Sequence, residues 1–429
     1  MMGGRSGTYN AEKIACVLSP ISLRRYLHFS TLLGVFSGAL SIYVGSTVFF
    51  FYFVMLFNLL LIWAFLGSVV LPKWLGSFLL YLAAGGAIGV FRGTDTIYLV
   101  VKQLGAISLS ALYFANFFEL EGNTVDRAWL TYCRMAYWSS VLALSLWPME
   151  CLIEHELVRL HGIATEPAAF CLLALPAWYW FAHSWKTSGR YRKEVAVITI
   201  AMGCSISSLG YLGMAIGLLF LLTSKRNVLS IFAPIVILCL LAGVYYLSEN
   251  VRIRASDTVT SLATNDLSGA NLSTYAILSN MFVTERVLAL HPFLGNGLGS
   301  HVLSNERYIS EAPGVEELVN STSWDAGANT HDAASLTLRS LSELGLVGFL
   351  GILWFIQHFR VGGFGYRAAI SSGILLVFFE KMLRGGGYSN PEQFFFIFVY
   401  FLNSRQFRQE RQGNSRRSAL EQLRPGKPV

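Results

Sequence analysis

Long apolar stretches separated by short polar connections run through most of the chain. A helix that crosses the roughly 30 Å hydrocarbon core of a bilayer needs about 20 mostly apolar residues. Twelve stretches approach this pattern, although several are short and the break at residues 205–210 is the least distinct. The pattern predicts an all-α polytopic membrane protein with about 12 transmembrane helices, at residues 26–46, 49–71, 74–91, 97–118, 129–149, 167–184, 194–207, 209–223, 228–247, 342–359, 368–384 and 391–403.

The composition supports this fold class. Charged residues make up 13 % of the chain and hydrophobic residues 54 %, whereas soluble domains carry roughly 25 % charged residues. Too little charge remains to cover a water-soluble surface of this size, which excludes a soluble enzyme, a secreted disulfide scaffold and a disordered chain. The ten-residue alternation of a membrane β-barrel is also missing from the sequence.

The distribution of Lys and Arg predicts the orientation of the helices. With twelve spans, the four most basic segments fall on one face, which is therefore cytoplasmic. The net charge of +7 then reflects topology and attraction to lipid headgroups, so we expect no nucleic-acid partner. The tail after Ser404 is predicted to be disordered. The basic segments are the N-terminus with Arg5, Lys13, Arg24 and Arg25, the connections at 186–193 and 225–226, and the tail 404–429.

One loop on the opposite, periplasmic face is long enough to fold by itself. Between residues 248 and 334 it holds ten Asp or Glu, four Arg and no Lys. The preference for Lys and Arg on the cytoplasmic face therefore does not explain its arginines. The sequence therefore divides into N-terminal transmembrane helices (1–154), central transmembrane helices with a periplasmic rim segment (155–247), a periplasmic loop carrying the active site (248–341), C-terminal transmembrane helices (342–403) and a basic cytoplasmic tail (404–429).

The cysteines and acidic residues do not predict a metal site. The six cysteines all lie in or beside predicted spans, and no CxxC occurs. A disulfide framework or a zinc site is therefore not expected. No acidic pair with metal-ligand spacing lies in a short outer loop, so we expect neither a metal nor another cofactor.

The candidate general base is His331. Helical spacing of apolar residues after Asn329 predicts a helix that runs toward the tenth span, with Asn329 as its N-cap and Asp332 at the third position. His331 would lie in the first turn, where the helix dipole lowers the pKa of an imidazole. A neutral imidazole is what a general base requires. The alternative is that His331 is merely a polar residue at a helix start.

A second candidate is Arg286, in a predicted amphipathic helix over Tyr275–Leu290 that ends before Pro292. The following turn, Gly295-x-Gly297-x-Gly299, permits positive φ angles and close backbone approach. Arg presents a planar fork that binds phosphate oxygens two at a time. The alternatives are a surface Arg paired with Glu285, and glycines that only serve a tight turn.

The remaining candidates lie at the outer rim of the membrane. Arg159 can reach phosphate, and Glu166 precedes Pro167 at the start of a span. Arg384 lies in a flexible outer link, before Gly385. The alternative for Arg159 and Glu166 is an interfacial anchor followed by a helix start.

Taken together, these segments resemble the O-antigen ligase and Wzy-type polysaccharide polymerase superfamily. Arg286 followed by Pro292–Gly299 matches the family's Arg shortly before a turn of Pro, two hydrophobic residues and Gly-x-Gly-x-Gly. A His-bearing segment and a Glu with Gly-Leu-x-Gly follow in the family, as in residues 329–332 and 343–348. Arg159-x-x-Gly-x-x-x-Glu166-Pro matches the polymerase branch. The resemblance covers roughly residues 155–359. The ligase motif Ser-Arg-x-Gly is absent, because Leu209 follows Ser208, and this favours the polymerase branch.

The resemblance implies a GT-C-like fold and a metal-independent glycosyl transfer with inversion. The donor would be a glycan on undecaprenyl diphosphate, and the acceptor another glycan, at the periplasmic face of the bacterial inner membrane. A chain-length regulator and a flippase would be partners, besides inner-membrane lipids. His331 would be the base and Glu166 a second acid/base, an Arg159 partner or a helix cap. Diphosphate or substrate contacts would come from Arg159, Arg286, Gly297, Asn329 and Arg384.

Three functions follow as alternatives. The first is a polymerase that joins lipid-linked repeat units of an O-antigen or exopolysaccharide. The second is an O-antigen ligase, with the same donor and lipid A-core as the acceptor. The third is a polysaccharide flippase or exporter, which needs charged residues inside the helix bundle. The charges of this sequence are expected to gather in outer loops instead, which argues against the flippase.

Overall fold

The computed structural model describes most of the chain, and the described part is mostly helical (76 %). This confirms an all-α fold apart from one two-stranded hairpin. The predicted span at 228–247 lies outside the described residues, apart from residue 246. The structure describes residues 20–38, 40–43, 47–156, 158–223, 246, 249–264, 266–322, 326–388 and 390–422.

The elements fall into an N-terminal helical part, a set of helices from the long loop, and three C-terminal helices. The N-terminal part comprises α2 (Pro20–Val35), β1 (Ser41–Tyr43), β2 (Thr47–Phe49), α3 (Phe50–Leu66), α4 (Lys73–Phe91), α5 (Ile97–Leu120), α6 (Asp126–Glu154), α7 (Pro167–Ser188), α8 (Arg192–Cys204) and α9 (Ser208–Thr223). The long loop contributes α11 (Glu249–Thr264), α12 (Leu272–Leu290), α13 (His301–Tyr308), η1 (Ile309–Glu311) and α14 (Val315–Thr322). The C-terminal helices are α15 (Leu336–His358), α16 (Tyr366–Leu383) and α17 (Pro391–Gln422).

Helix α7 forms the centre of one half of the bundle. It packs against α6, α8, α9 and α16, and every residue from Phe170 to His183 is buried. A helix that is apolar around its whole circumference is expected inside a bundle. By contrast, α3 and α4 leave many apolar side chains exposed, such as Leu80 and Trp63, which is the distribution expected of helices that face lipid.

Three helices are long and apolar enough to cross a membrane, namely α4, α5 and α15. Two shorter apolar helices, α3 and α9, approach the same pattern. The length and composition of these helices indicate a membrane protein. Ten of the twelve predicted spans coincide with a described helix over most of their length. The exceptions are 26–46, of which α2 covers only residues 26–35, and 228–247.

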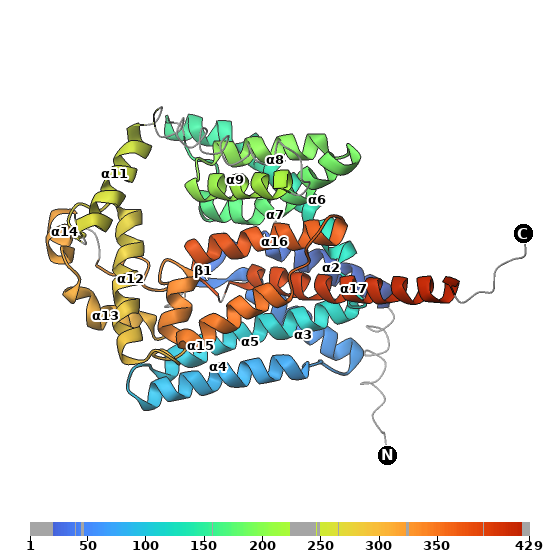
Figure 1. The fold of residues 1–429 in the computed structure, drawn as a ribbon, viewed down its shortest axis with the longest axis horizontal. Coiled ribbons are helices and arrows are strands. Elements are labelled where there is room, and N and C mark those ends of the chain that lie inside the picture. Colours follow the sequence, from blue (N-terminus) through green and yellow to red (C-terminus); the bar gives the residue numbers. More distant parts are fainter. Residues whose placement is uncertain are drawn as a thin grey trace, which may run out of the picture.

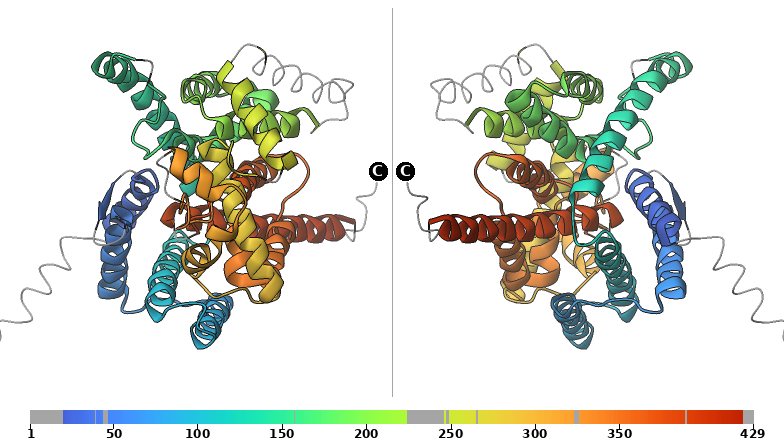
Figure 2. Two further views of the ribbon diagram at one scale, coloured as in Figure 1. Left: turned by 90° about the vertical axis from the view of Figure 1, so that its left-hand side faces the viewer. Right: turned by 90° about the vertical axis from the view of Figure 1, so that its right-hand side faces the viewer.

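The bundle has two distinct ends (Figure 1). Helices α11–α14 cover one end, which we call the loop end, and the C-terminal half of α17 projects beyond the other, which we call the tail end. Figure 2 shows the helices of the long loop lying across the loop end. They enclose a small core of their own, formed by Tyr275, Val283, Ile309, Ala312, Val315 and Leu318.

The loops between the predicted spans should lie alternately on the two faces of the membrane, and contacts between these loops can be compared with that prediction. At the loop end, Thr94 Oγ1 donates to the carbonyl of Asn296 (2.8 Å). At the tail end, Arg367 pairs with Asp126 (2.7 Å) and with Glu410 (2.9 Å). In each case both partners belong to connections that twelve alternating spans place on the same face, so the packing agrees with the predicted parity.

Two predicted boundaries are wrong. The first predicted span, 26–46, is cut short because α2 ends at Val35 and the chain continues into the hairpin of β1 and β2, where Ser41 pairs with Phe49. The tail after Ser404 is not disordered, because α17 continues to Gln422. The tail is rich in Arg, Gln and Glu, which favour helices, and no proline interrupts it before residue 425.

Candidate functional site

His331 lies on an exposed loop before α15, and not in a helix as predicted. Helix α15 begins at Leu336, and its N-cap is Ser335, whose side chain accepts a hydrogen bond from the backbone of Leu338 (3.2 Å). Asp332 does not cap a helix either, since its carboxylate accepts from the backbone N–H of Ala334 (3.0 Å). The prediction that His331 lies in the first turn of a helix capped by Asn329 is therefore wrong.

The backbone around His331 is strained. Asn329, Ala333 and Ala334 have φ angles of 59°, 54° and 56°. Residues with a Cβ atom avoid this left-handed region, at a cost of roughly 1–2 kcal/mol each. Strain of this kind persists only where the surroundings fix the conformation, and it concentrates at functional sites.

Hydrogen bonds on both sides fix the His331 loop, which we define as residues 326–335. On one side Tyr275 and Asn280 of α12 donate to the carbonyls of Ala326 (2.9 Å) and Ala328 (3.1 Å). On the other side, Gly385 N–H donates to the carbonyl of Ala334 (2.8 Å), and Ser335 Oγ donates to the carbonyl at the end of α16 (2.8 Å). The loop is thus anchored at both ends while His331 itself stays accessible.

A buried ion pair on α15 contributes to the contacts between this helix and the link after α16. Arg339 Nε and Glu343 Oε1 lie 3.0 Å apart, one turn apart on α15, with side chains only 3 % and 1 % exposed. The guanidinium also donates to the carbonyl of Gly386 (3.3 Å) and stacks on the ring of Tyr388 (4.1 Å). The contacts of Arg339 with Gly386 and Tyr388 attach the link 384–388 to α15. Breaking a buried ion pair by removing one partner typically costs about 3–5 kcal/mol, so Glu343 stabilises the position of Arg339.

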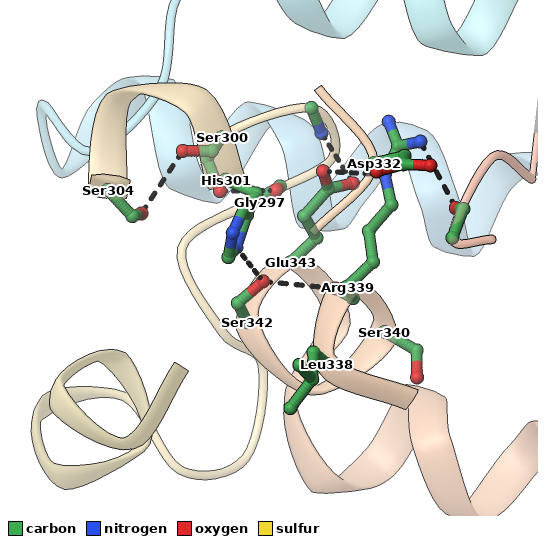
Figure 3. Close-up of polar contacts among 12 residues, drawn as sticks. Gly297, Ser300, His301, Ser304, Asp332, Leu338, Arg339, Ser340, Ser342 and Glu343 are labelled. Carbon is green, nitrogen blue, oxygen red and sulfur yellow. Dashed lines mark hydrogen bonds and ion pairs between the residues drawn. The ribbon is translucent and has the colours of Figure 1, made fainter. Parts of the chain in front are cut away.

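His301 completes the polar network beneath the loop (Figure 3). Its Nε2 faces Oδ1 of Asn280 (2.8 Å), which can only accept, so Nε2 carries the proton. Nδ1 then accepts from the hydroxyl of Ser342 (2.7 Å). Burial, and next the Arg339 guanidinium, lower the pKa of His301 to about 3. His301 is therefore neutral and structural, and it is not available to a substrate.

The Gly295–Gly299 turn has the predicted positive φ angles, 62°, 111° and 96° for its three glycines. Close approach is also confirmed, but the partner is the protein itself. A Cβ at Gly297 would lie 3.0 Å from the carboxylate of Asp95, and Gly297 N–H donates to the carbonyl of Glu343 (3.0 Å). Gly297 is buried in this contact, which favours the tight-turn alternative over a phosphate contact.

Asp95 lies under this turn, in the connection between α4 and α5. It is 6 % exposed, and its Oδ2 has no hydrogen-bond partner in the described part of the chain. Burial raises the pKa of Asp95 to about 7, the hydrogen bond from Thr96 opposes this shift, and the nearby Glu343 adds to it. The sequence did not single out Asp95, because an acidic residue between two spans is usually a solvated cap.

Arg286 lies on the exposed side of α12, whose bounds confirm the predicted helix to within a few residues. Its partner is Glu311 of η1 (3.4 Å), and not Glu285 as the alternative proposed. Both side chains are half exposed, and the guanidinium also lies over the ring of Phe282 (5.0 Å). A phosphate that binds Arg286 would therefore compete with Glu311 in an accessible place.

Arg159 and Glu166 lie in the connection between α6 and α7. Arg159 donates to the carbonyl of Ile206 (3.0 Å) at the break between α8 and α9. Glu166 is the residue before α7, it is exposed, and its side chain makes no capping bond. Among the described residues, no hydrogen bond or ion pair joins Arg159 to Arg286 or to His331. The structure thus brings together the loop of Asn329 and His331 with the link that begins at Arg384.

The expectation that charges gather only in outer loops is wrong. Glu380 and Lys381 of α16 are 0 % and 4 % exposed. In the residues that the structure describes, neither carboxylate oxygen of Glu380 has a hydrogen-bond partner, and the side chain points toward Gly213 of α9. With Asp95, Arg339 and Glu343, five Asp, Glu, Lys or Arg side chains are buried at this end of the bundle. The sequence pointed only to Glu343, through its motif, because helical wheels do not reveal which face another helix covers.

Comparisons with known proteins do not assign the chain to a family. No family model matches the sequence, and no curated protein is significantly similar to it. Among the described residues, no group of three His, Cys, Asp or Glu side chains has a geometry suited to a metal ion. The function must therefore be argued from the site itself.

Proposed function

We propose that this protein is a polymerase that joins oligosaccharide repeat units carried on undecaprenyl diphosphate, at the periplasmic face of the bacterial inner membrane. The observation that carries the proposal is His331, an exposed imidazole on a strained loop anchored by hydrogen bonds at both ends. A rigid, accessible imidazole is suited to general base catalysis. The motif resemblance of residues 155–359 provides the substrate class.

In the proposed reaction His331 accepts the proton of an acceptor sugar hydroxyl. The hydroxyl oxygen forms a bond to the anomeric carbon of the donor, and the bond from that carbon to the lipid diphosphate breaks with inversion. Undecaprenyl diphosphate leaves with the bonding electron pair. Arg286 is accessible enough to neutralise its charge, and Arg384 lies in the link that is bonded to the His331 loop. His331 then returns its proton to water.

A cellular test is the length of the polymer. In cells that depend on this protein, we expect His331→Ala to leave the protein in the membrane and single repeat units on the lipid carrier. Polymer of normal length in the variant would contradict the proposal. If the protein were instead an O-antigen ligase, cells lacking it would still make long polymer on undecaprenyl lipid. This result distinguishes the ligase from the polymerase.

A polysaccharide flippase remains a second candidate, because of Glu380. A buried carboxylate without a hydrogen-bond donor is costly, and inside a membrane bundle such a group commonly belongs to a transport pathway. A flippase moves a lipid-linked glycan without forming a glycosidic bond. Reconstituted protein that transfers sugar in the absence of other proteins would exclude it.

A further inference from the structure

Three arginines and a histidine lie along one side of the loop end, where loop 92–96 meets α12 and α13. We call Arg92, Arg286, His291 and Arg307 the basic strip. Arg307 Nη2 donates to the carbonyl of Gly93, next to Arg92 (3.4 Å). Glu311 follows Arg307 by four residues and pairs with Arg286 (3.4 Å). The first contact joins Arg307 to the loop that follows Arg92, and the second joins Arg286 to the 3-10 helix that follows α13.

The strip is exposed, and two of its three arginines, Arg92 and Arg307, form no ion pair with an acidic side chain in the described part of the chain. Glu311 is the single acid paired with the strip there. Glu285 and Glu306 precede Arg286 and Arg307 in the chain, but adjacent residues on a helix point in different directions. The strip therefore attracts anions.

His291 contributes hydrogen bonding more than charge. Burial, and next the Arg92 guanidinium, lower the pKa of His291. This places Arg92 close to the end of α12. The cationic groups are then the three guanidiniums, which bind phosphate oxygens two at a time.

An apolar surface adjoins the strip on the side of the membrane. Phe91, the last residue of α4, is 96 % exposed, and Phe293 and Leu290 are 67 % and 60 % exposed. Helix α4 is a candidate span, so Arg92 lies where hydrocarbon gives way to headgroups. Arg beside exposed aromatic side chains is typical of that boundary.

Helix α15, another candidate span, also reaches the boundary between hydrocarbon and headgroups. Val347 N–H donates to the carbonyl of Phe293 (3.1 Å), which fixes the turn of Phe293 against this helix. Val347 and Leu350 are themselves 48 % and 57 % exposed. The apolar surface beneath the strip thus continues down a helix that would face lipid tails.

We propose that the basic strip binds the diphosphate headgroup of a membrane lipid in the leaflet at the loop end, with the lipid chain against Phe91, Leu290 and Phe293. Charge complementarity and the adjoining apolar surface favour a lipid over a soluble anion. The proposal rests on the proposed function only for the identity of that lipid, undecaprenyl diphosphate. The strip would receive the donor from the bilayer and lead it to Arg286.

Binding without turnover tests this proposal. The full-length protein, in nanodiscs of phosphatidylcholine, is titrated with undecaprenyl diphosphate that carries no sugar, and bound lipid is counted by native mass spectrometry. We expect the double variant Arg92→Gln/Arg307→Gln to bind at least about tenfold more weakly. Arg127→Gln is the matched control, because Arg127 is also half exposed but lies near the tail end.

The double variant could weaken binding merely by changing the conformation of loop 92–96. A second variant tests the strip without removing any of its arginines. Glu311→Gln leaves the Arg307–Gly93 contact intact and releases Arg286, so we expect several-fold tighter binding. Unchanged binding in both the double variant and Glu311→Gln would overturn the proposal. So would equal competition by inorganic diphosphate or by phosphatidylglycerol. Because no sugar is transferred, these outcomes are independent of the test of the proposed function.

Discussion

At the residue scale, the most informative groups are buried polar side chains in the connections and helices at the loop end. Asp95, His301 and Glu380 were not singled out by the sequence, because their burial depends on contacts with helices far away in the chain. His331, Arg286 and Arg159 were found through motif spacing, which requires no knowledge of the packing. The capping argument for His331 failed because Ser335 caps α15 in its place.

Asp95 gives a prediction for the pH dependence of stability. Its pKa is about 7 in the folded protein and about 3.9 in an unfolded chain. Between these values the folded state binds more protons, so stability falls as the pH rises. We expect Asp95→Asn to raise the midpoint of thermal unfolding at pH 8 and to have little effect near pH 4, measured in detergent. An equal effect at both pH values would show that the carboxyl does not titrate in this range.

At the element scale, the helices themselves were largely predictable, and their connections were not. Apolar periodicity located α12 and most of the bundle helices. It could not show that the 329–334 segment is a turn, because alanines favour helices and their left-handed conformation is imposed by α12 and the link after α16. The hairpin of β1 and β2 was hidden in the same way within an apolar run.

A substitution of Gly345 tests the contact between α15 and the Gly295–Gly299 turn. Its φ and ψ angles of 64° and −166° interrupt the helix, and such angles are nearly restricted to glycine. A Cβ there would also collide with the backbone of Phe293. We expect Gly345→Ala to lower the thermal midpoint by several degrees and to speed proteolysis of the long loop.

The matched control is Gly351→Ala, on the same helix. Gly351 has open space around its Cα and ordinary helical geometry, so alanine there is expected to be neutral or slightly stabilising. Equal behaviour of the two variants would mean that the kink at Gly345 does not hold the turn in place.

At the scale of the whole molecule, the account depends on which end of the bundle faces which side of the membrane. The loop end carries the acidic loop and the basic strip, and the tail end carries the basic tail (Figure 1). Hydropathy and Lys/Arg counts predicted this separation, and the contacts between connections agree with it.

Labelling of single cysteines tests the orientation. In a variant without native cysteines, we expect Glu317→Cys, on α14 at the loop end, to react with a membrane-impermeant maleimide from outside intact spheroplasts. Gln412→Cys, on the projecting part of α17, is expected to react only after permeabilisation. The reverse pattern would place His331 in the cytoplasm, away from any periplasmic substrate.

The most direct measurement of the central claim is glycosyl transfer by the purified protein. Protein reconstituted in liposomes is supplied with a radiolabelled repeat unit on undecaprenyl diphosphate, and the products are separated by length. The account predicts a ladder of longer glycans with wild-type protein and with the control Arg127→Gln, and a loss of at least about 100-fold in rate with His331→Ala, the order of a general base. An absence of new glycosidic bonds with the native protein, or an unchanged ladder with His331→Ala, would contradict it.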